Sequence, residues 1–185
     1  MGNCIEQLKA QLNEAKDTQG DWQTPYYELI KEVYNQPVLF FALSREAFNP
    51  EDGTSIPLIS TKDFNGTPAL YVFTDVNIAT LWMRHYKHTT DDMKYGLIAA
   101  IEKGKFDFLS AFVLARNFGT QLIMLDEGAS FVAIRMQEFM EQNNIDPNNI
   151  QMPISKEQYE KIIAENESIK PEFVRVKAIP LAFDK

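Results

Sequence analysis

Residues 68–75, PALYVFTD, carry the clearest indication of the fold in this chain of 185 residues. Most of it, residues 69–74, is rich in aromatic and β-branched side chains, which are typical of a strand. Thr74 and Asp75 then offer the short polar side chains that cap the start of a helix. The residues that follow at helical spacing are Ile78, Leu81, Trp82, His85 and Tyr86. A strand that passes directly into an amphipathic helix predicts a domain in which helices pack on a sheet.

Two short apolar runs before this stretch predict further strands, at residues 38–43 (VLFFAL) and 56–60 (IPLIS). The pair Asn65-Gly66 then favours a tight turn, because both residues tolerate a positive φ. Strand segments joined by turn-rich connections are typical of consecutive antiparallel strands.

Two helices are expected ahead of these strands. The second begins with Thr24 as its capping residue and Pro25 as its first helical residue, and its apolar stripe is Tyr26, Leu29, Ile30, Val33 and Tyr34. The first has only a thin stripe, formed by Ile5, Leu8, Leu12 and Ala15. A thin stripe suits a helix that packs weakly or docks on another chain, so self-association through this helix is one expectation.

The rest of the chain predicts alternating helices and strands. Residues 106–118 are apolar nearly all round, which indicates a buried helix that stops at Gly119. Another helix is predicted before it from the spacing of Leu97, Ile98 and Ile101. The later elements are a strand at 121–125, a turn at 126–128, a strand or helix lead-in at 131–134, a helix through Met136, Phe139 and Met140, a helix at 155–169 and a strand at 173–183.

These elements predict a single α/β domain of the α+β type, with a mixed or mainly antiparallel sheet and helices packed on it. Residues 25–145 form the domain itself. Residues 1–24 add an N-terminal helix with its connection, and residues 146–185 add a helix-strand extension packed on the domain. Hydrophobic residues make up 45% of the chain and aromatic residues 12%, so a sizeable core can form and overall disorder is excluded.

The charge and the cysteine content narrow the classes of partner. The chain has 26 acidic and 18 basic residues, a formal net charge of −8, which disfavours binding to nucleic acid. Cys4 is the single cysteine, so neither an intramolecular disulfide nor a multi-cysteine zinc site can form. No apolar run approaches the roughly 20 residues that a membrane span needs. We therefore expect a cytoplasmic protein that does not bind the membrane.

The middle of the chain resembles the N-terminal domain of the SseB family of bacterial proteins, over residues 25–143. The segments that carry the resemblance are VLFFALS, IPLIST, PALYVFTD with the helix that reaches Trp82, and TQLIMLDEG. The family usually has an Asn-Pro-Gly turn where this chain has Asp126-Glu127-Gly128. The resemblance implies an α/β fold and brings no established catalytic residues. It therefore supports the expected fold far more than any activity.

One stretch, HYKHTTDD at residues 85–92, has the composition of a metal site. His85 and His88 share a helix face, and Asp91 and Asp92 could complete a divalent-metal site for a metal-dependent hydrolase. The spacing fits no well-defined class of metal site, and His85 also belongs to an apolar stripe. An ordinary exposed helix end and loop is the interpretation that we favour, so neither a metal nor another cofactor is expected.

Four residues remain as candidates for binding. Asp126 and Glu127 are paired carboxylates on a turn, from which side chains can reach a cleft. Trp22 lies in the polar connection at 16–24, and Tyr27 follows it in the next helix. Trp and Tyr are frequent anchors of protein interfaces because they bury a large area with few rotatable bonds.

The sequence contains no G-x-S-x-G, G-x-G-x-x-G or Walker motif, so no catalytic residue is assigned. We therefore expect a non-catalytic interaction or regulatory domain of the SseB type that binds another protein. Two alternatives stay open. One is the metal-dependent hydrolase that would use His85, His88 and Asp91. The other is an acidic inhibitor or immunity protein that masks a basic target.

Overall fold

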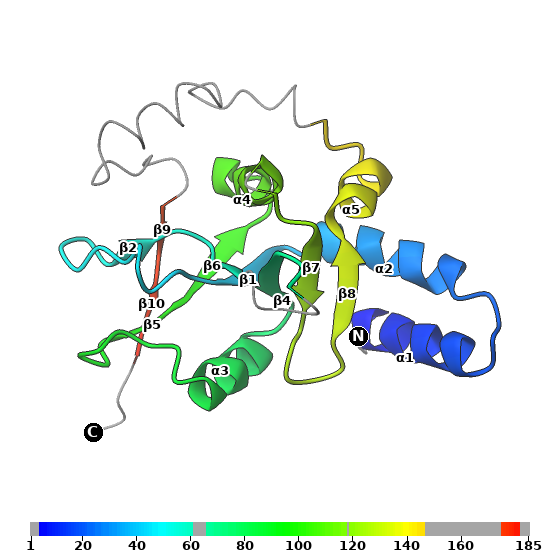
Figure 1. Ribbon diagram of the computed structural model, residues 1–185, viewed down its shortest axis with the longest axis horizontal. Helices are drawn as coiled ribbons and strands as arrows, with labels where there is room; N and C mark the ends of the chain where they lie inside the picture. The colour runs from blue at the N-terminus through cyan, green and yellow to red at the C-terminus, as the bar shows by residue number, and fades with distance from the viewer. Residues whose placement is uncertain (1–3, 61–65, 118, 147–174, 182–185) are drawn as a thin grey trace.

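The computed structural model describes residues 4–60, 66–117, 119–146 and 175–181. Its centre is a mixed sheet with the strand order β6-β1-β4-β7-β8 (Figure 1). The strands are β1 (Val38–Ala42), β4 (Ala69–Phe73), β6 (Ile98–Glu102), β7 (Leu122–Leu125) and β8 (Val132–Arg135). Only β4 and β7 run parallel, and the other pairs along this order are antiparallel.

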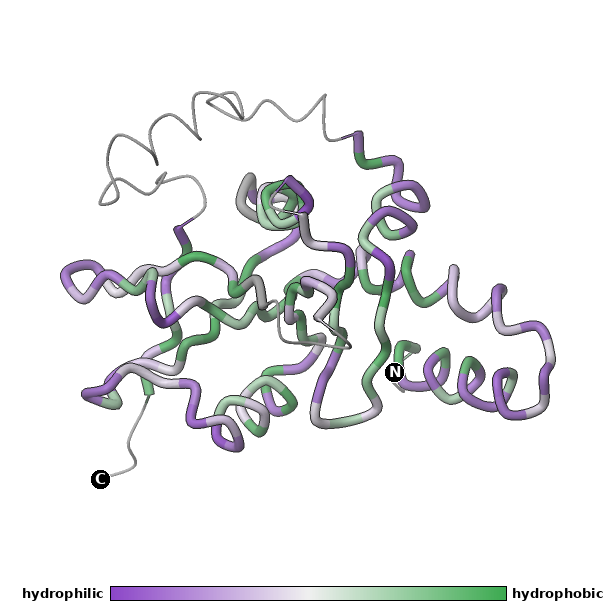
Figure 2. The backbone as a smooth tube through the Cα atoms, in the orientation of Figure 1, coloured by the Kyte–Doolittle hydropathy of each residue, from purple (hydrophilic) through white to green (hydrophobic). Residues whose placement is uncertain are grey.

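Side chains alternate between the two faces of the sheet, and each face has its own helices. On one face Leu70 and Val72 of β4 pack with α1 (Cys4–Asp17), α2 (Gln23–Asn35), α4 (Phe106–Asn117) and α5 (Met136–Gln142). On the other face Tyr71 and Phe73 pack against Trp82 of α3 (Val76–His85). Hydrophobic residues follow the central strands and α4, as Figure 2 shows. The predicted α+β class with a mixed sheet is confirmed.

Five short strands of the described residues extend this core. The strand β3 (Ile59–Ser60) pairs antiparallel with the first half of β4, while β1 pairs with its second half. The strand β2 (Thr54–Ser55) pairs with β9 (Val176–Lys177), and β5 (Tyr95–Gly96) pairs with β10 (Ile179–Pro180). The last described segment of the chain therefore returns to the domain. The antiparallel relation predicted for 38–43, 56–60 and 69–74 is confirmed.

The helix predicted from Leu97, Ile98 and Ile101 is wrong, because these residues belong to an extended segment. Residues 98–102 form β6, which pairs antiparallel with β1 from Ile98↔Ala42 to Val38↔Glu102. The spacing of the three apolar residues fits a helix and an extended segment almost equally well. Pairing with β1 decides between them, since it buries Ile98 and Ile101 on opposite faces of the sheet.

The start of α2 also differs from the prediction. The helix begins at Gln23, so Thr24 is not its capping residue and Pro25 is not its first helical residue. Asp21 supplies the capping oxygen instead: its carboxylate accepts from the backbone N–H groups of Gln23 at 3.1 Å and Thr24 at 3.3 Å. A carboxylate at the start of a helix satisfies backbone donors that have no partner within the helix.

The end of the chain is described in part. Residues 173–183 were predicted as one strand, but the described residues 175–181 form the two short strands β9 and β10. The helix predicted at 155–169 and Asn65 of the predicted turn lie outside the described residues. Gly66 does have the positive φ, +81°, that the turn prediction requires.

Candidate functional site

The carboxyl ends of the two parallel strands meet at Asp126. Thr74 follows β4 and Asp126 follows β7, so strand pairing brings the two side by side. One oxygen of Asp126 accepts from the backbone N–H of Thr74 at 2.7 Å, and the other accepts from the hydroxyl of Thr74, also at 2.7 Å. The carboxylate is fully buried, and Asp126 itself has a positive φ of 54°. Asp tolerates this conformation better than most residues.

A lysine of α1 completes this arrangement. The ammonium of Lys9 lies 2.5 Å from Asp126 and 2.7 Å from Glu6, and the Lys9 side chain is 1% exposed. Ser130 also donates to Glu6, at 2.7 Å. Partial burial opposes the charge of Glu6, but the hydrogen bonds from Lys9 and Ser130 outweigh it and hold the pKa of Glu6 below its usual value. The network pins α1 to the ends of β4 and β7.

The predicted binding residues Asp126 and Glu127 take part in internal contacts. No surface of Asp126 is open to solvent, so a partner that docks on the molecule cannot touch its side chain. Glu127 accepts from the indole N–H of Trp82 at 2.6 Å. Trp82 is 5% exposed and lies 5.4 Å from Phe73 between ring centroids, so it belongs to the core, as its place on an apolar stripe suggested. Of the two carboxylates, only Glu127 is within reach of a ligand.

The other predicted pair, Trp22 and Tyr27, lies at the outer end of the α1–α2 pair. Trp22 is 43% exposed. Its ring meets Tyr26 edge-on at 5.9 Å between centroids, and Tyr26 in turn lies 5.6 Å from Tyr27. The buried Tyr26 thus contacts both Trp22 and Tyr27, and Trp22 stays partly exposed to solvent. We call Trp22, Tyr26 and Tyr27 the aromatic cluster.

Tyr26 fixes this cluster to the edge of the sheet. Its hydroxyl donates to Glu138 of α5 at 2.8 Å and accepts from the backbone N–H of Arg135 at 3.1 Å. Burial raises the pKa of the Tyr26 phenol well above its usual value, so the proton needed for the bond to Glu138 stays in place at neutral pH. A buried ring whose hydroxyl makes two hydrogen bonds gives Trp22 a rigid support, which is the property expected of an interface anchor.

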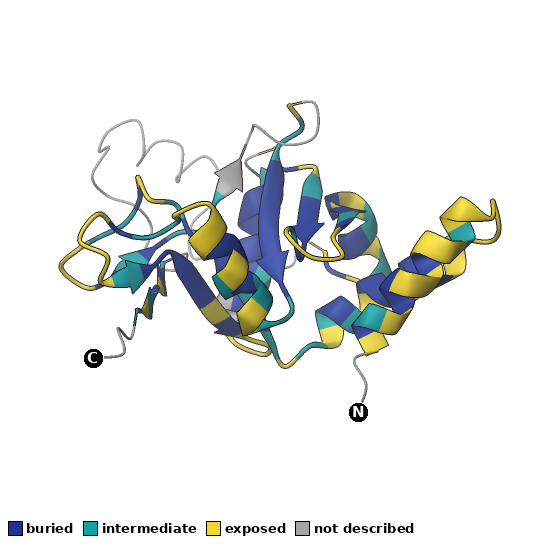
Figure 3. Cartoon of the chain, turned by 90° about the horizontal axis from the view of Figure 1, so that it is seen from below, coloured by how far each residue is buried: buried dark blue, intermediate teal, exposed yellow. Residues whose placement is uncertain are grey.

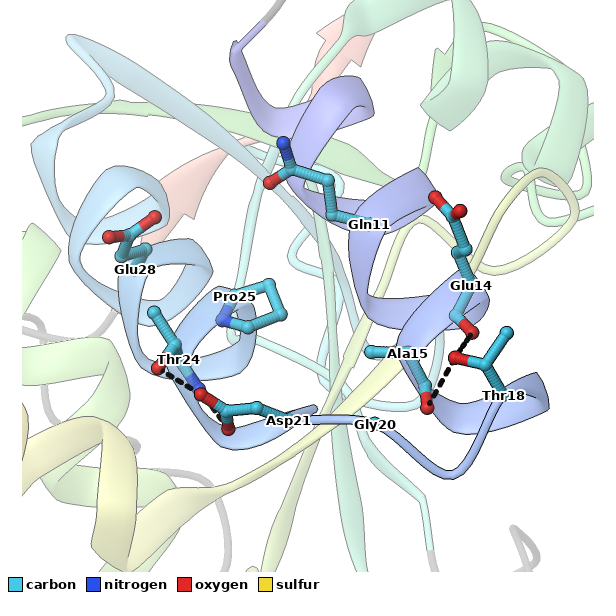
Figure 4. Close-up of a pocket in the computed structure, with 9 residues that line it drawn as sticks. All are labelled: Gln11, Glu14, Ala15, Thr18, Gly20, Asp21, Thr24, Pro25 and Glu28. Carbon is cyan, nitrogen blue, oxygen red and sulfur yellow. Dashed lines mark hydrogen bonds between the residues drawn. The ribbon is translucent and has the colours of Figure 1, made fainter.

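A notch of about 460 Å³ lies between α1 and α2, and Asp21, the sequence neighbour of Trp22, helps to line it. Glu14 and Glu28 stand on its two walls, and Asp21 lies at its base in the turn that joins the helices (Figure 4). Among the described residues, its lining holds three carboxylates and no basic side chain. The hydroxyl of Thr24 donates to Asp21 at 2.7 Å, and this bond is the first of those that hold the pKa of Asp21 below its usual value. The notch is therefore negatively charged at neutral pH.

The four metal candidates do not form one group. His88 is half-buried, and its Nε2 lies 2.7 Å from the carbonyl oxygen of Leu43. His85 packs edge-on against Tyr86. Asp91 forms an ion pair with Arg45 at 3.3 Å. Asp92 accepts a hydrogen bond from the hydroxyl of Thr90 at 2.7 Å. Among the residues that the structure describes, no three His, Cys, Asp or Glu side chains are placed to hold an ion.

Sequence reasoning missed Lys9, Thr74 and Tyr26 as members of these networks. Lys9 left a signal that could have found it. It stands four residues after Ile5 and three before Leu12, on the buried stripe of α1, where a charged residue needs a buried partner. Nothing in the sequence pairs Lys9 with Asp126, because 117 positions separate them.

Comparison with family models, with curated proteins and with solved structures finds no match for this chain in any of the three. None of the helices in the described part of the chain is long and apolar enough to cross a membrane.

Proposed function

We propose that this chain is a non-catalytic protein-interaction domain, of the kind that its resemblance to the SseB family implies, and that it binds its partner through the aromatic cluster. The observation that carries the proposal is the 43% exposure of Trp22 on a rigid support. An indole that stays partly exposed while it contacts a fixed ring has little conformational entropy left to lose on binding. Residues of this kind contribute most of the binding free energy in many interfaces.

The charge of the notch indicates what kind of partner fits. The notch brings Glu14, Asp21 and Glu28 together, and Asp21 precedes Trp22 in the chain. Lysine and arginine side chains complement such a surface, and arginine also stacks well on tryptophan. The favoured partner is therefore a protein with a basic segment. Masking of a basic target by an acidic inhibitor is a second candidate function, and it is supported by the same notch and by the net charge of −8.

An affinity experiment tests the proposal. The immobilised full chain is exposed to a lysate of its native cell, and bound proteins are eluted in salt steps and identified by mass spectrometry. We expect a basic protein that binds wild type, elutes with rising salt, and is lost from Trp22→Ala. Charge reversal of the notch, Glu14→Lys with Glu28→Lys, is expected to weaken its retention as well, because charge complementarity is removed.

The matched control is Leu81→Ala, which removes an apolar side chain that is 64% exposed on α3. This variant is expected to retain the same protein as wild type. Circular dichroism confirms that each variant is folded before the comparison. Equal retention by wild type and Trp22→Ala would contradict the proposal, and so would equal loss from Leu81→Ala.

A further inference from the structure

The outer edge of β8 borders a second concave surface, on the side where α1 lies (Figure 1). A groove of about 520 Å³ is lined by Asn13 and Lys16 of α1 and by residues 129–133 of the β7–β8 connection and β8. We call it the edge groove. Phe131, at its margin, is 44% exposed. Lys16 is the one charged residue in the described lining of the groove.

The hydrogen bonds of β8 show which backbone groups face this groove. The N–H of Met136 donates to the carbonyl of Gln121 at 2.9 Å, so these two residues form a hydrogen-bonded pair. Such pairs alternate with non-hydrogen-bonded pairs along antiparallel strands. The pair Arg135↔Leu122 is therefore not hydrogen-bonded, which agrees with the bond from the Arg135 N–H outward to Tyr26.

The same alternation determines the direction in which the backbone N–H and C=O of Ala133 point. Its partner on β7 is Met124, two positions along from the Arg135↔Leu122 pair, so this pair is not hydrogen-bonded either. The N–H and C=O of Ala133 both point away from β7, toward the edge groove. Within the described part of the chain, no hydrogen bond involves either backbone group of Ala133. A donor and an acceptor on one residue at a strand edge are the pattern that an added strand recognises.

We propose that the edge groove binds an extended segment of another protein, which adds to β8 at Ala133 and places an acidic side chain at Lys16. The paired donor and acceptor of Ala133 match the backbone of one residue of an extended chain. Lys16 matches a carboxylate, and the apolar margin at Phe131 matches an apolar neighbour of that acid. The proposal concerns a different surface from the aromatic cluster and stands without it.

The structure also favours a foreign segment over a second copy of this chain. If two copies of β8 paired antiparallel about Ala133, residue 131 of one copy would lie opposite Arg135 of the other. That pairing needs access to Arg135, where Tyr26 already holds the N–H. Each copy also carries a formal charge of −8. A short segment that bonds only around Ala133 avoids both conflicts.

The test follows the amide of Ala133 by NMR. The full chain, labelled with ¹⁵N, is titrated with the acetylated and amidated pentapeptide Val-Thr-Val-Glu-Val up to about 2 mM, a range that detects weak binding. We expect saturable shifts at Ala133 and Lys16, and protection of the Ala133 amide from exchange. The same peptide with Lys in place of Glu is expected to bind several-fold more weakly.

Two variants have matched controls. Ala133→Pro removes the outward N–H without removing a bond to β7, and it is expected to weaken binding about tenfold. Its control, Ala133→Val, keeps the N–H and is expected to bind within about twofold of wild type. Lys16→Glu is expected to reverse the preference between the two peptides. Its control, Lys31→Glu, changes an exposed lysine of α2 that does not line the groove.

Several outcomes would overturn the proposal. The first is the absence of saturable shifts with the acidic peptide. Equal binding by Ala133→Pro and Ala133→Val would do so as well, and so would shifts centred on Trp22 instead of Ala133. If sedimentation shows a dimer that Ala133→Pro dissociates, the occupant is a second copy and the assignment to a foreign segment is wrong. Lys16→Glu, on the surface of α1, keeps the test valid if the proline variant does not fold.

Discussion

Lys9 and Asp126 are oppositely charged groups that are both withdrawn from water, at 1% and 0% side-chain exposure. Replacement of Asp126 by Asn keeps the shape but leaves the ammonium of Lys9 without its main counter-charge. We expect Asp126→Asn to lower the free energy of unfolding by about 3 kcal/mol, because an unpaired buried charge is costly. Urea unfolding followed by circular dichroism measures the change.

The double variant Lys9→Met with Asp126→Asn separates the charge from the packing. Replacement of both charged groups by uncharged ones is expected to recover most of the lost stability. The exposed change Lys31→Met is the control and should alter stability by no more than about 0.5 kcal/mol. If the double variant is as unstable as Asp126→Asn alone, the loss does not come from the unpaired lysine.

Among the elements, β6 is the one whose strand structure most needs a test, because the sequence predicted a helix there. Ala100 is exposed on β6, opposite Phe40 of β1. Ala100→Thr is expected to stabilise the protein by about 0.5 kcal/mol, since β-branched residues suit a strand better than alanine. Ala10 is exposed on α1, and Ala10→Thr is expected to destabilise by about 0.5 kcal/mol for the opposite reason. A loss of stability in Ala100→Thr would argue against the strand. Urea midpoints of the two variants provide the comparison.

The elements that the sequence predicted well are those whose pattern fits only one structure. Residues 69–74 are apolar and rich in β-formers, and Asp75 caps the next helix as expected, accepting from the N–H of Asn77 at 2.6 Å. Residues 97–101 are different, because their spacing fits a helix and an extended segment alike and only the pairing with β1 decides. The cap at Asp21 was missed because Thr24-Pro25 offers an equally good local signal.

At the scale of the whole molecule, α1 belongs to the same apolar cluster as the sheet. Ile5, Leu8 and Leu12 are buried with α2, although the ends of α1 and α2 project from the sheet (Figure 3). We therefore expect one cooperative unfolding transition. In Trp22→Phe the remaining tryptophan, Trp82, reports on the sheet and α3. Its fluorescence and the far-ultraviolet circular dichroism should give the same urea midpoint. An earlier loss of dichroism would mean that α1 and α2 unfold separately.

Burial of the α1 stripe also bears on the expectation of self-association through this helix. Of the apolar side chains that suggested it, Ile5, Leu8 and Leu12 are buried in the cluster that includes α2 and the sheet, so a second copy would have to use other side chains of α1. The sequence pointed to Trp22 and Tyr27 as binding residues from their chemistry alone. It could not reveal Tyr26 as the support beneath them, because the bonds to Arg135 and Glu138 span more than a hundred positions.

The hydrogen bond that the backbone N–H of Arg135 donates to the Tyr26 hydroxyl has a consequence for solubility. A bare strand at the margin of a sheet is a template on which chain after chain can stack into a fibril. The Tyr26 hydroxyl already occupies one outward backbone N–H of β8, that of Arg135. The part of the strand edge that stays open is therefore too short for strands to add one after another. Loss of that phenol, as in Tyr26→Phe, would lengthen the open margin and expose the protein to aggregation.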